Sequence, residues 1–90
     1  MKKLFVLIAK QYDPSYRAVQ AGHAVAEYLL KNGEWKNETL VYVLSEDIEL
    51  DYQVLTEMGF DLYPFREPDV GNQITAIAVI LVIKYFIVMR

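Results

Sequence analysis

The sequence contains no cysteine and only one histidine, His23. Without thiols the chain can form no disulfide framework, no zinc-thiolate site and no cysteine nucleophile. A metal site would need a set of carboxylates, and no segment has the spacing of a metal-binding loop. We therefore expect no metal and no cofactor. The lack of cysteine also fits a reducing compartment, so we expect the protein to be cytoplasmic.

Basic residues are scarce outside the first part of the chain. Residues 1–26 carry four basic residues and one acidic residue, whereas residues 27–69 carry three basic residues and eleven acidic ones. A polyanion such as RNA can therefore approach the N-terminal part of the molecule more easily than the rest. An ordinary solvated surface explains the same charges equally well.

The length of 90 residues predicts one domain over residues 1–90, and the pattern of segments along it predicts an α/β domain with the element order βαβαββ. Its hydrophobic content of 54% is typical of globular proteins rather than of disordered ones. A chain this short buries only about 60–65% of the surface of its extended form. Because the core is small, association of two copies would stabilise it, and we expect a homodimer.

The first helix is the most clearly marked element of the sequence. Asp13 is suited to cap its N-terminus, Pro14 suits the first helical position, and Asn32-Gly33 marks its end. Helical spacing predicts one small, apolar face that packs on a sheet. The residues of this predicted buried face are Ala18, Gly22, Val25, Ala26 and Leu29.

A polar stripe runs along one flank of the same helix. It consists of Tyr16, Gln20, His23 and Glu27, at spacings that place them on one side. One interpretation is that the stripe lines a functional site. The other is that His23 is a half-buried boundary residue bonded to a neighbour such as Glu27.

The remaining segments alternate between strand and helix. Lys3–Ala9 is a continuous apolar run, typical of a central strand covered on both faces. Thr39–Leu44 is a second strand, and the helix between them predicts a parallel pair. Ser45 is expected to cap a second helix that ends at Gly59. Pro64 indicates that the third strand, Phe60–Arg66, lies at a sheet edge.

These elements predict an α/β fold. The last segment, Ile74–Arg90, is apolar except at three positions. As one strand it would extend roughly 50 Å, too long for this domain. We expect a buried strand with an apolar extension from about residue 80. A transmembrane helix is the rival interpretation, but Lys84 interrupts the run before it reaches the usual ~20 residues.

Two segments together resemble the type 2 peptidyl-tRNA hydrolases. Residues 17–24 (RAVQAGHA) are similar to the Ala-Ala-Gln-x-x-His-Ala signature on the first helix of that family. Residues 67–78 (EPDVGNQITAIA) are similar to its acidic loop, which ends in Gln-Ile or Gln-Val before the final strands. The resemblance implies a three-layer α/β/α sandwich, in which helices cover both faces of a small mixed, mostly parallel four-stranded sheet. It also implies metal-independent hydrolysis of the ester that joins a peptide to the 3′ end of tRNA, with peptidyl-tRNA or another RNA end as partner.

The resemblance also implies roles for individual residues. Those expected to be catalytic are Asp69, His23 and Thr75, and those expected to bind substrate are Lys10, Tyr16, Arg17, Gln20, Asn72 and Gln73. Two family positions differ here. Tyr16 stands where the family has a lysine, and Pro68 stands where it has its catalytic aspartate, between Glu67 and Asp69. Considered alone, Asp69 is equally well explained as a turn former, and Arg17 as a solvated helix residue.

Two other functions fit the sequence. The first is a non-catalytic α/β module that dimerises through its apolar C-terminal segment and binds RNA or a protein. The second, weaker one is a small membrane-associated protein, although we expect no contact with a membrane.

Overall fold

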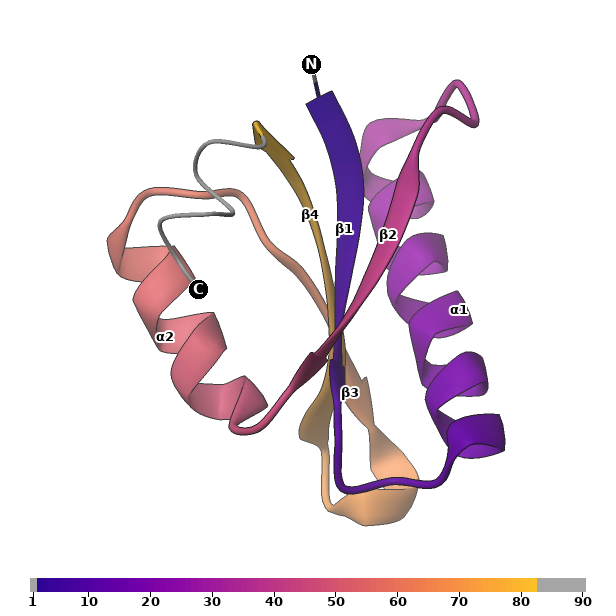
Figure 1. Cartoon of the computed structure of the whole chain (residues 1–90), viewed down its shortest axis with the longest axis vertical. Coiled ribbons are helices and arrows are strands. Elements are labelled where there is room, and N and C mark those ends of the chain that lie inside the picture. The colour runs from indigo at the N-terminus through magenta and orange to yellow at the C-terminus, as the bar shows by residue number, and fades with distance from the viewer. Residues whose placement is uncertain (1, 83–90) are drawn as a thin grey trace.

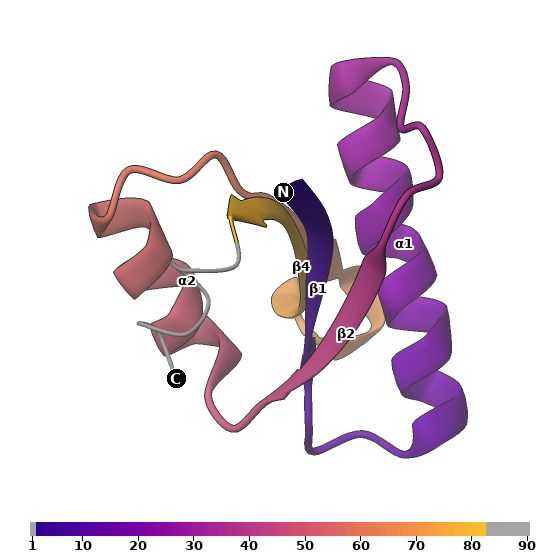
Figure 2. The same ribbon diagram turned by 45° about the horizontal axis from the view of Figure 1, so that its top comes forward.

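A four-stranded sheet carries one helix against each of its faces in the computed structural model (Figures 1 and 2). The structure describes the backbone of residues 2–82 and the side chains of residues 3–80. The elements in chain order are β1 (Lys2–Ala9), α1 (Pro14–Asn32), β2 (Leu40–Ser45), α2 (Ile48–Glu57), β3 (Tyr63–Glu67), the short 3₁₀ helix η1 (Pro68–Val70) and β4 (Gln73–Val82).

The strand order in the sheet is β2-β1-β4-β3. Only β1 and β2 run parallel, while β4 is antiparallel to both of its neighbours. The α/β class and the mixed sheet are therefore confirmed, but the expectation of a mostly parallel sheet is wrong. The physical reason is the link between β3 and β4. It contains only η1 and two further residues, too few for the crossover that a parallel pair requires.

Strand β1 lies at the centre of the core, as its apolar run predicts. Alternate side chains point to opposite faces of the sheet, as the pleat requires. Those buried on the α1 side are Leu4, Val6 and Ile8, and those buried on the α2 side are Phe5, Leu7 and Ala9. Ala21 and Ala24 of α1 close the first layer, and Ile48 and Leu55 of α2 close the second.

The predicted ends of α1 are confirmed, but its predicted buried face is wrong. An Asp13 carboxylate oxygen accepts a hydrogen bond from the Tyr16 amide at 3.1 Å, and Gly33 ends the helix with φ of 82°. The buried residues are Gln20, Ala21 and Ala24. Of the predicted face, Val25 is half-buried and the other four residues are exposed. The error arises because the polar Gln20 is buried, which rotates the packed face away from the most apolar one.

The start of α2 also differs from the prediction. Asp47, not Ser45, caps this helix by accepting a hydrogen bond from the Leu50 amide at 3.1 Å. Ser45 is instead the last residue of β2, and its buried hydroxyl donates to the Asp51 carboxylate at 2.5 Å. This side-chain bond ties the end of β2 to the first turn of α2.

Strand β3 lies at an edge of the sheet, as Pro64 predicts. The predicted last strand is present as β4, whereas the expected extension falls largely on residues 83–90, outside the described residues. Among the residues that the structure describes, no helix has both the length and the apolar character needed to cross a bilayer.

Candidate functional site

Three polar side chains meet inside the molecule between α1, the end of β3 and the start of β4. The Gln20 amide donates to a Glu67 carboxylate oxygen (Oε1) at 2.9 Å, and the Thr75 hydroxyl donates to the Gln20 amide oxygen at 2.6 Å. Gln20 and Thr75 are fully buried, and Glu67 is 9% exposed. We call Gln20, Glu67 and Thr75 the buried polar cluster. It joins the two segments on which the family resemblance depends.

A change of register in the sheet brings Thr75 to this position. Phe65 of β3 pairs with Ala76, but the next residue, Arg66, pairs with Ile74. Thr75 therefore has no partner in β3, as expected for the extra residue of a bulge. Its side chain turns toward α1, while Ile74 packs into the core on the α2 side. Simple alternation along β4 could not have predicted this orientation.

The Glu67 carboxylate is held by donors on both of its oxygens. Besides the bond from Gln20 to Oε1, the other oxygen (Oε2) accepts from the Asp69 backbone amide at 3.3 Å, where Glu67 caps η1. The one ion pair among the described side chains, Lys10 with Glu46, lies elsewhere. A carboxylate held by neutral donors and almost out of solvent keeps a defined orientation and free lone pairs. It is thus able to accept a proton from a bound water molecule.

Tyr16 lies half-buried beside this carboxylate. Burial, followed by the negative charge of Glu67, the neighbouring Tyr12 and the charge of Asp69, raises the pKa of the Tyr16 hydroxyl above its ordinary value of 10.0. The phenol therefore stays protonated at neutral pH and can donate a hydrogen bond. Asp69 itself is exposed on η1, next to Glu67.

His23 is exposed on the flank of α1 that faces β3. Its imidazole ring stacks on Phe65, with ring centres 4.2 Å apart and planes inclined by 9°. The expectation of a half-buried histidine bonded to Glu27 is therefore not met, and the ring remains open to solvent on its outer face. Further along the contact between α1 and β3, the rings of Tyr28 and Tyr63 pack edge to face, with their centres 5.2 Å apart.

The two predicted cations are engaged within the molecule. The Arg17 guanidinium donates from Nη2 to the Lys10 carbonyl oxygen at 2.6 Å, and its buried Nε has no hydrogen-bond partner among the described residues. Lys10 forms its ion pair with Glu46 at 2.7 Å, on the side of the sheet where α2 begins. Arg17 therefore stays near the cluster, one turn before Gln20, whereas the Lys10 side chain points away from it.

Asn72 and Gln73 are exposed where η1 leads into β4. The backbone amide of Asn72 donates to the backbone carbonyl of Glu67 at 2.9 Å. The backbone carbonyl of Asn72 accepts from the Arg66 guanidinium at 3.3 Å. Asn72 has a positive φ of 61°, which asparagine tolerates better than most residues. The two backbone hydrogen bonds of Asn72 therefore close the turn that follows Glu67. Gln73 pairs with Glu67 in the sheet, but its side chain forms no hydrogen bond with the cluster among the described residues.

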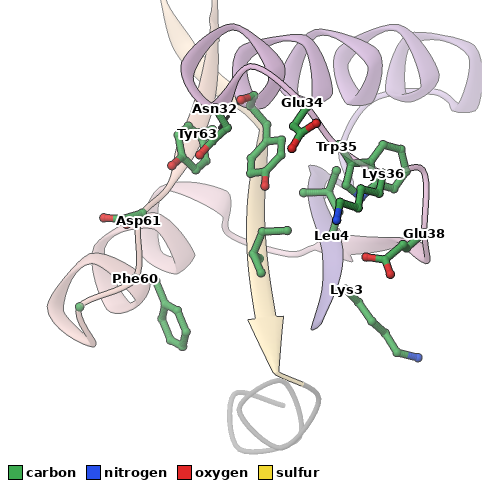
Figure 3. A pocket seen from close by; sticks show the side chains of 13 residues that line it. Lys3, Leu4, Asn32, Glu34, Trp35, Lys36, Glu38, Phe60, Asp61 and Tyr63 are labelled. Atoms are coloured by element: carbon green, nitrogen blue, oxygen red, sulfur yellow. Dashed lines mark hydrogen bonds between the residues drawn. The ribbon is translucent and has the colours of Figure 1, made fainter. Parts of the chain in front are cut away.

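A separate cavity of about 530 Å³ lies at the opposite end of β1 (Figure 3). The apolar Leu4 and Ile80 line it together with polar side chains that include Asn32, Lys36 and Asp61. No hydrogen-bonded pair of a base and a nucleophile or water-positioning group occurs among its described side chains. We therefore place the candidate site at the buried polar cluster rather than at this cavity.

Gln20 and Thr75, which the sequence analysis singled out, lie in the buried polar cluster, whereas Glu67, which joins them there, was not among the predicted site residues. The signal available was an acidic residue at a strand end just before a proline, at the family's acidic loop. Comparison of the sequence with models of protein families and with curated proteins found no match in either case. Functional inference therefore depends on the geometry of the site and on the two short segments.

Proposed function

We propose that the protein is a peptidyl-tRNA hydrolase-like enzyme that cleaves the ester between a peptide and the 3′ end of tRNA. The observation that carries this proposal is the convergence of the two family-like segments in one hydrogen-bonded cluster around the Glu67 carboxylate. We further propose the three-layer α/β/α sandwich that the resemblance implies, and a cytoplasmic location, where such a substrate occurs.

In this proposal Glu67 is the general base. Water bound between Glu67 and Asp69 loses a proton to Glu67 while its oxygen attacks the ester carbonyl carbon. The bond from that carbon to the ribose oxygen then breaks, and Glu67 passes the proton to this oxygen, which leaves as the ribose hydroxyl. Gln20 and Thr75 are positioning residues, because both are fully buried and cannot contact a substrate.

The side chains at the rim of the cluster supply the remaining interactions. Tyr16 donates to the carbonyl oxygen as negative charge develops on it, a contribution that is strongest in the transition state. The positive charge of the half-buried Arg17 guanidinium attracts the terminal phosphate. The open face of His23, supported by Phe65, offers a stacking surface for the terminal base. Asp69 orients the attacking water from the solvent side.

The test is release of free tRNA from labelled N-blocked aminoacyl-tRNA. We expect Glu67→Gln, which keeps the shape but not the basicity, to lower kcat/KM by about 10²–10⁴-fold. Asp69→Asn should lower it less. Glu57→Gln is the matched control, because it makes the same change at an exposed position of α2 and should leave the rate unchanged. Thermal unfolding of each variant separates lost chemistry from lost fold.

The outcomes distinguish the parts of the proposal. If Asp69→Asn abolishes hydrolysis and Glu67→Gln does not, the reaction assignment holds and the base is Asp69. If purified wild-type protein releases no tRNA, or if both variants retain the full rate, the proposed function is wrong.

One observation favours a second candidate, a non-catalytic module that binds an RNA end. The buried side chains of Gln20 and Thr75 bond each other, and Gln20 also bonds Glu67, rather than solvent, as structural polar groups do. In that case the wild-type protein retards tRNA in a gel at low salt without releasing it. Substitution of Arg17 by alanine then weakens this binding, and Glu67→Gln does not.

A further inference from the structure

The two edges of the sheet differ in how they are protected. Strand β3 has the features that prevent unwanted strand pairing: it is only five residues long, contains Pro64 and Arg66, and has the register shift. Strand β2, at the other edge, has the sequence LVYVLS and contains no charge, no proline and no glycine. Its pairing with β1 is regular over its whole length. Among the strands that the structure describes, only β2 therefore leaves an edge open to another strand.

The side chains of β2 are also unusually exposed for their type. Leu40, Tyr42 and Leu44 are 39%, 52% and 40% exposed and point to the face of the sheet that carries α1. Both helices pack mainly on the other strands, and Figure 2 shows β2 at the near edge of the sheet with α1 and α2 on either side. The exposed flank of α1 next to this face is formed by the small or apolar Ala18, Gly22 and Leu29.

The backbone of β2 is oriented for pairing at the same residues. The carbonyls of Thr39 and Ser45 accept hydrogen bonds from β1, so alternate residues 39, 41, 43 and 45 direct their polar groups inward. The amide and carbonyl groups of Leu40, Tyr42 and Leu44 consequently point to the open edge, because these groups alternate along a strand. A strand placed there would satisfy all of them.

We propose that β2 pairs antiparallel with β2 of a second copy of this chain, about a two-fold axis at Tyr42. In this register Tyr42 faces Tyr42 of the second copy, and Leu40 faces Leu44. Each facing pair exchanges two backbone hydrogen bonds, and the two four-stranded sheets become one. A shift of the register by two residues would leave one of the three pairs unmade.

Charge and closure favour a second copy over a different partner. A two-fold axis brings identical residues together, so a strand that pairs with itself must avoid charges at its centre, and β2 has none although the chain carries a net charge of −3. The interface is self-complementary and closes with two copies. Growth beyond a dimer is blocked because β3, the other edge, is protected.

The size of the surface sets the expected affinity. With about 200 Å² for a fully exposed large side chain, the exposed parts of Leu40, Tyr42 and Leu44 amount to roughly 250 Å² per copy. A stable interface commonly buries about 800 Å² per partner, so the backbone pairs and the adjacent flank of α1 must contribute the rest. We therefore expect a weak dimer that dissociates in the micromolar range.

Sedimentation of the purified full chain over a wide concentration range tests the proposal. Wild-type protein should pass from monomer to dimer. Tyr42→Lys brings two positive charges together at the axis and should weaken the dimer at least tenfold. Leu30→Lys is the matched control, because Leu30 is 79% exposed on the far part of α1, and it should sediment as wild type. Circular dichroism checks that both variants fold.

The lack of cysteine allows a second test that does not depend on loss of binding. Tyr42→Cys places the sole thiol of each chain at the axis, so a short thiol-to-thiol cross-linker should join two copies, whereas Leu30→Cys should remain uncross-linked. A wild-type protein that stays monomeric at several hundred micromolar overturns the proposal. So does a dimer that survives Tyr42→Lys, since its interface must then lie elsewhere in the chain.

Discussion

At the scale of single residues, the buried polar cluster is the part of the molecule where loss of one hydrogen-bonding group should lower stability most. Gln20 is fully buried, yet both ends of its amide are satisfied, one by Glu67 and the other by Thr75. A neutral hydrogen bond contributes little net stability, but removal of one partner leaves the other buried and unsatisfied. The hydroxyl of Thr75 therefore fixes which way the Gln20 amide points, and through it the Glu67 carboxylate.

Thr75→Val should lower the free energy of unfolding by about 1–3 kcal/mol, because valine keeps the shape but leaves the Gln20 amide oxygen without a donor. Urea unfolding measures the change. Thr56→Val is the matched control, since the Thr56 hydroxyl bonds the exposed Tyr52 carbonyl on α2, and we expect a change within about 0.5 kcal/mol. Equal losses at both sites would show that the cluster has no special energetic role.

At the scale of elements, the N-terminus of α1 depends on the Asp13 carboxylate. Hydrogen bonds from the Ser15 hydroxyl and the Tyr16 amide hold the pKa of Asp13 below 3.8. Because the folded pKa is lowered, this contribution is complete above the unfolded pKa and is lost as the pH falls through the folded pKa. Asp13→Ala should therefore lower Tm by several degrees at pH 7, and by less near pH 2.

Asp13→Asn provides the control for this prediction. Asparagine caps helices about as well as aspartate but does not titrate. Calorimetry across pH 2–7 should therefore show Asp13→Asn close to wild type at neutral pH, with a cap contribution that does not fade on acidification. A gap between wild type and Asp13→Ala that stays constant down to pH 2 would contradict the assignment of the effect to the charged carboxylate.

The elements also show what the sequence could predict. The caps of α1, the central position of β1 and the edge position of β3 follow from local rules, namely capping chemistry, an unbroken apolar run and a proline. The buried face of α1 and the orientation of Thr75 do not. Both depend on tertiary features, the burial of a satisfied polar group and a bulge, which the periods of 3.6 and 2 residues do not represent. Glu67, the centre of the candidate site, is placed by the same tertiary features. From the sequence it could be recognised only as an acidic residue next to Pro68.

At the scale of the whole molecule, the candidate site and the proposed dimer interface lie at opposite edges of one sheet. The candidate site lies where α1 meets β3 and the start of β4, and the proposed dimer forms at β2, with β1 and β4 between them (Figure 1). Residues at such a separation, without shared contacts, have independent effects on free energy. A dimer built through β2 thus leaves both copies of the candidate site uncovered.

Because the two sites are apart, we expect that hydrolysis and dimerisation can be removed separately by substitution. Tyr42→Lys should keep the wild-type rate of tRNA release per chain within about twofold, and Glu67→Gln should sediment as wild type. The stability of the pair should also depend on concentration, because association stabilises the folded state by mass action. We expect Tm of the wild-type protein to rise by a few degrees from 1 to 300 μM, and that of Tyr42→Lys to stay constant. If Tyr42→Lys lost hydrolysis and dimerisation together, the site would be completed by the second copy, and the placement of the two functions on separate edges would be wrong.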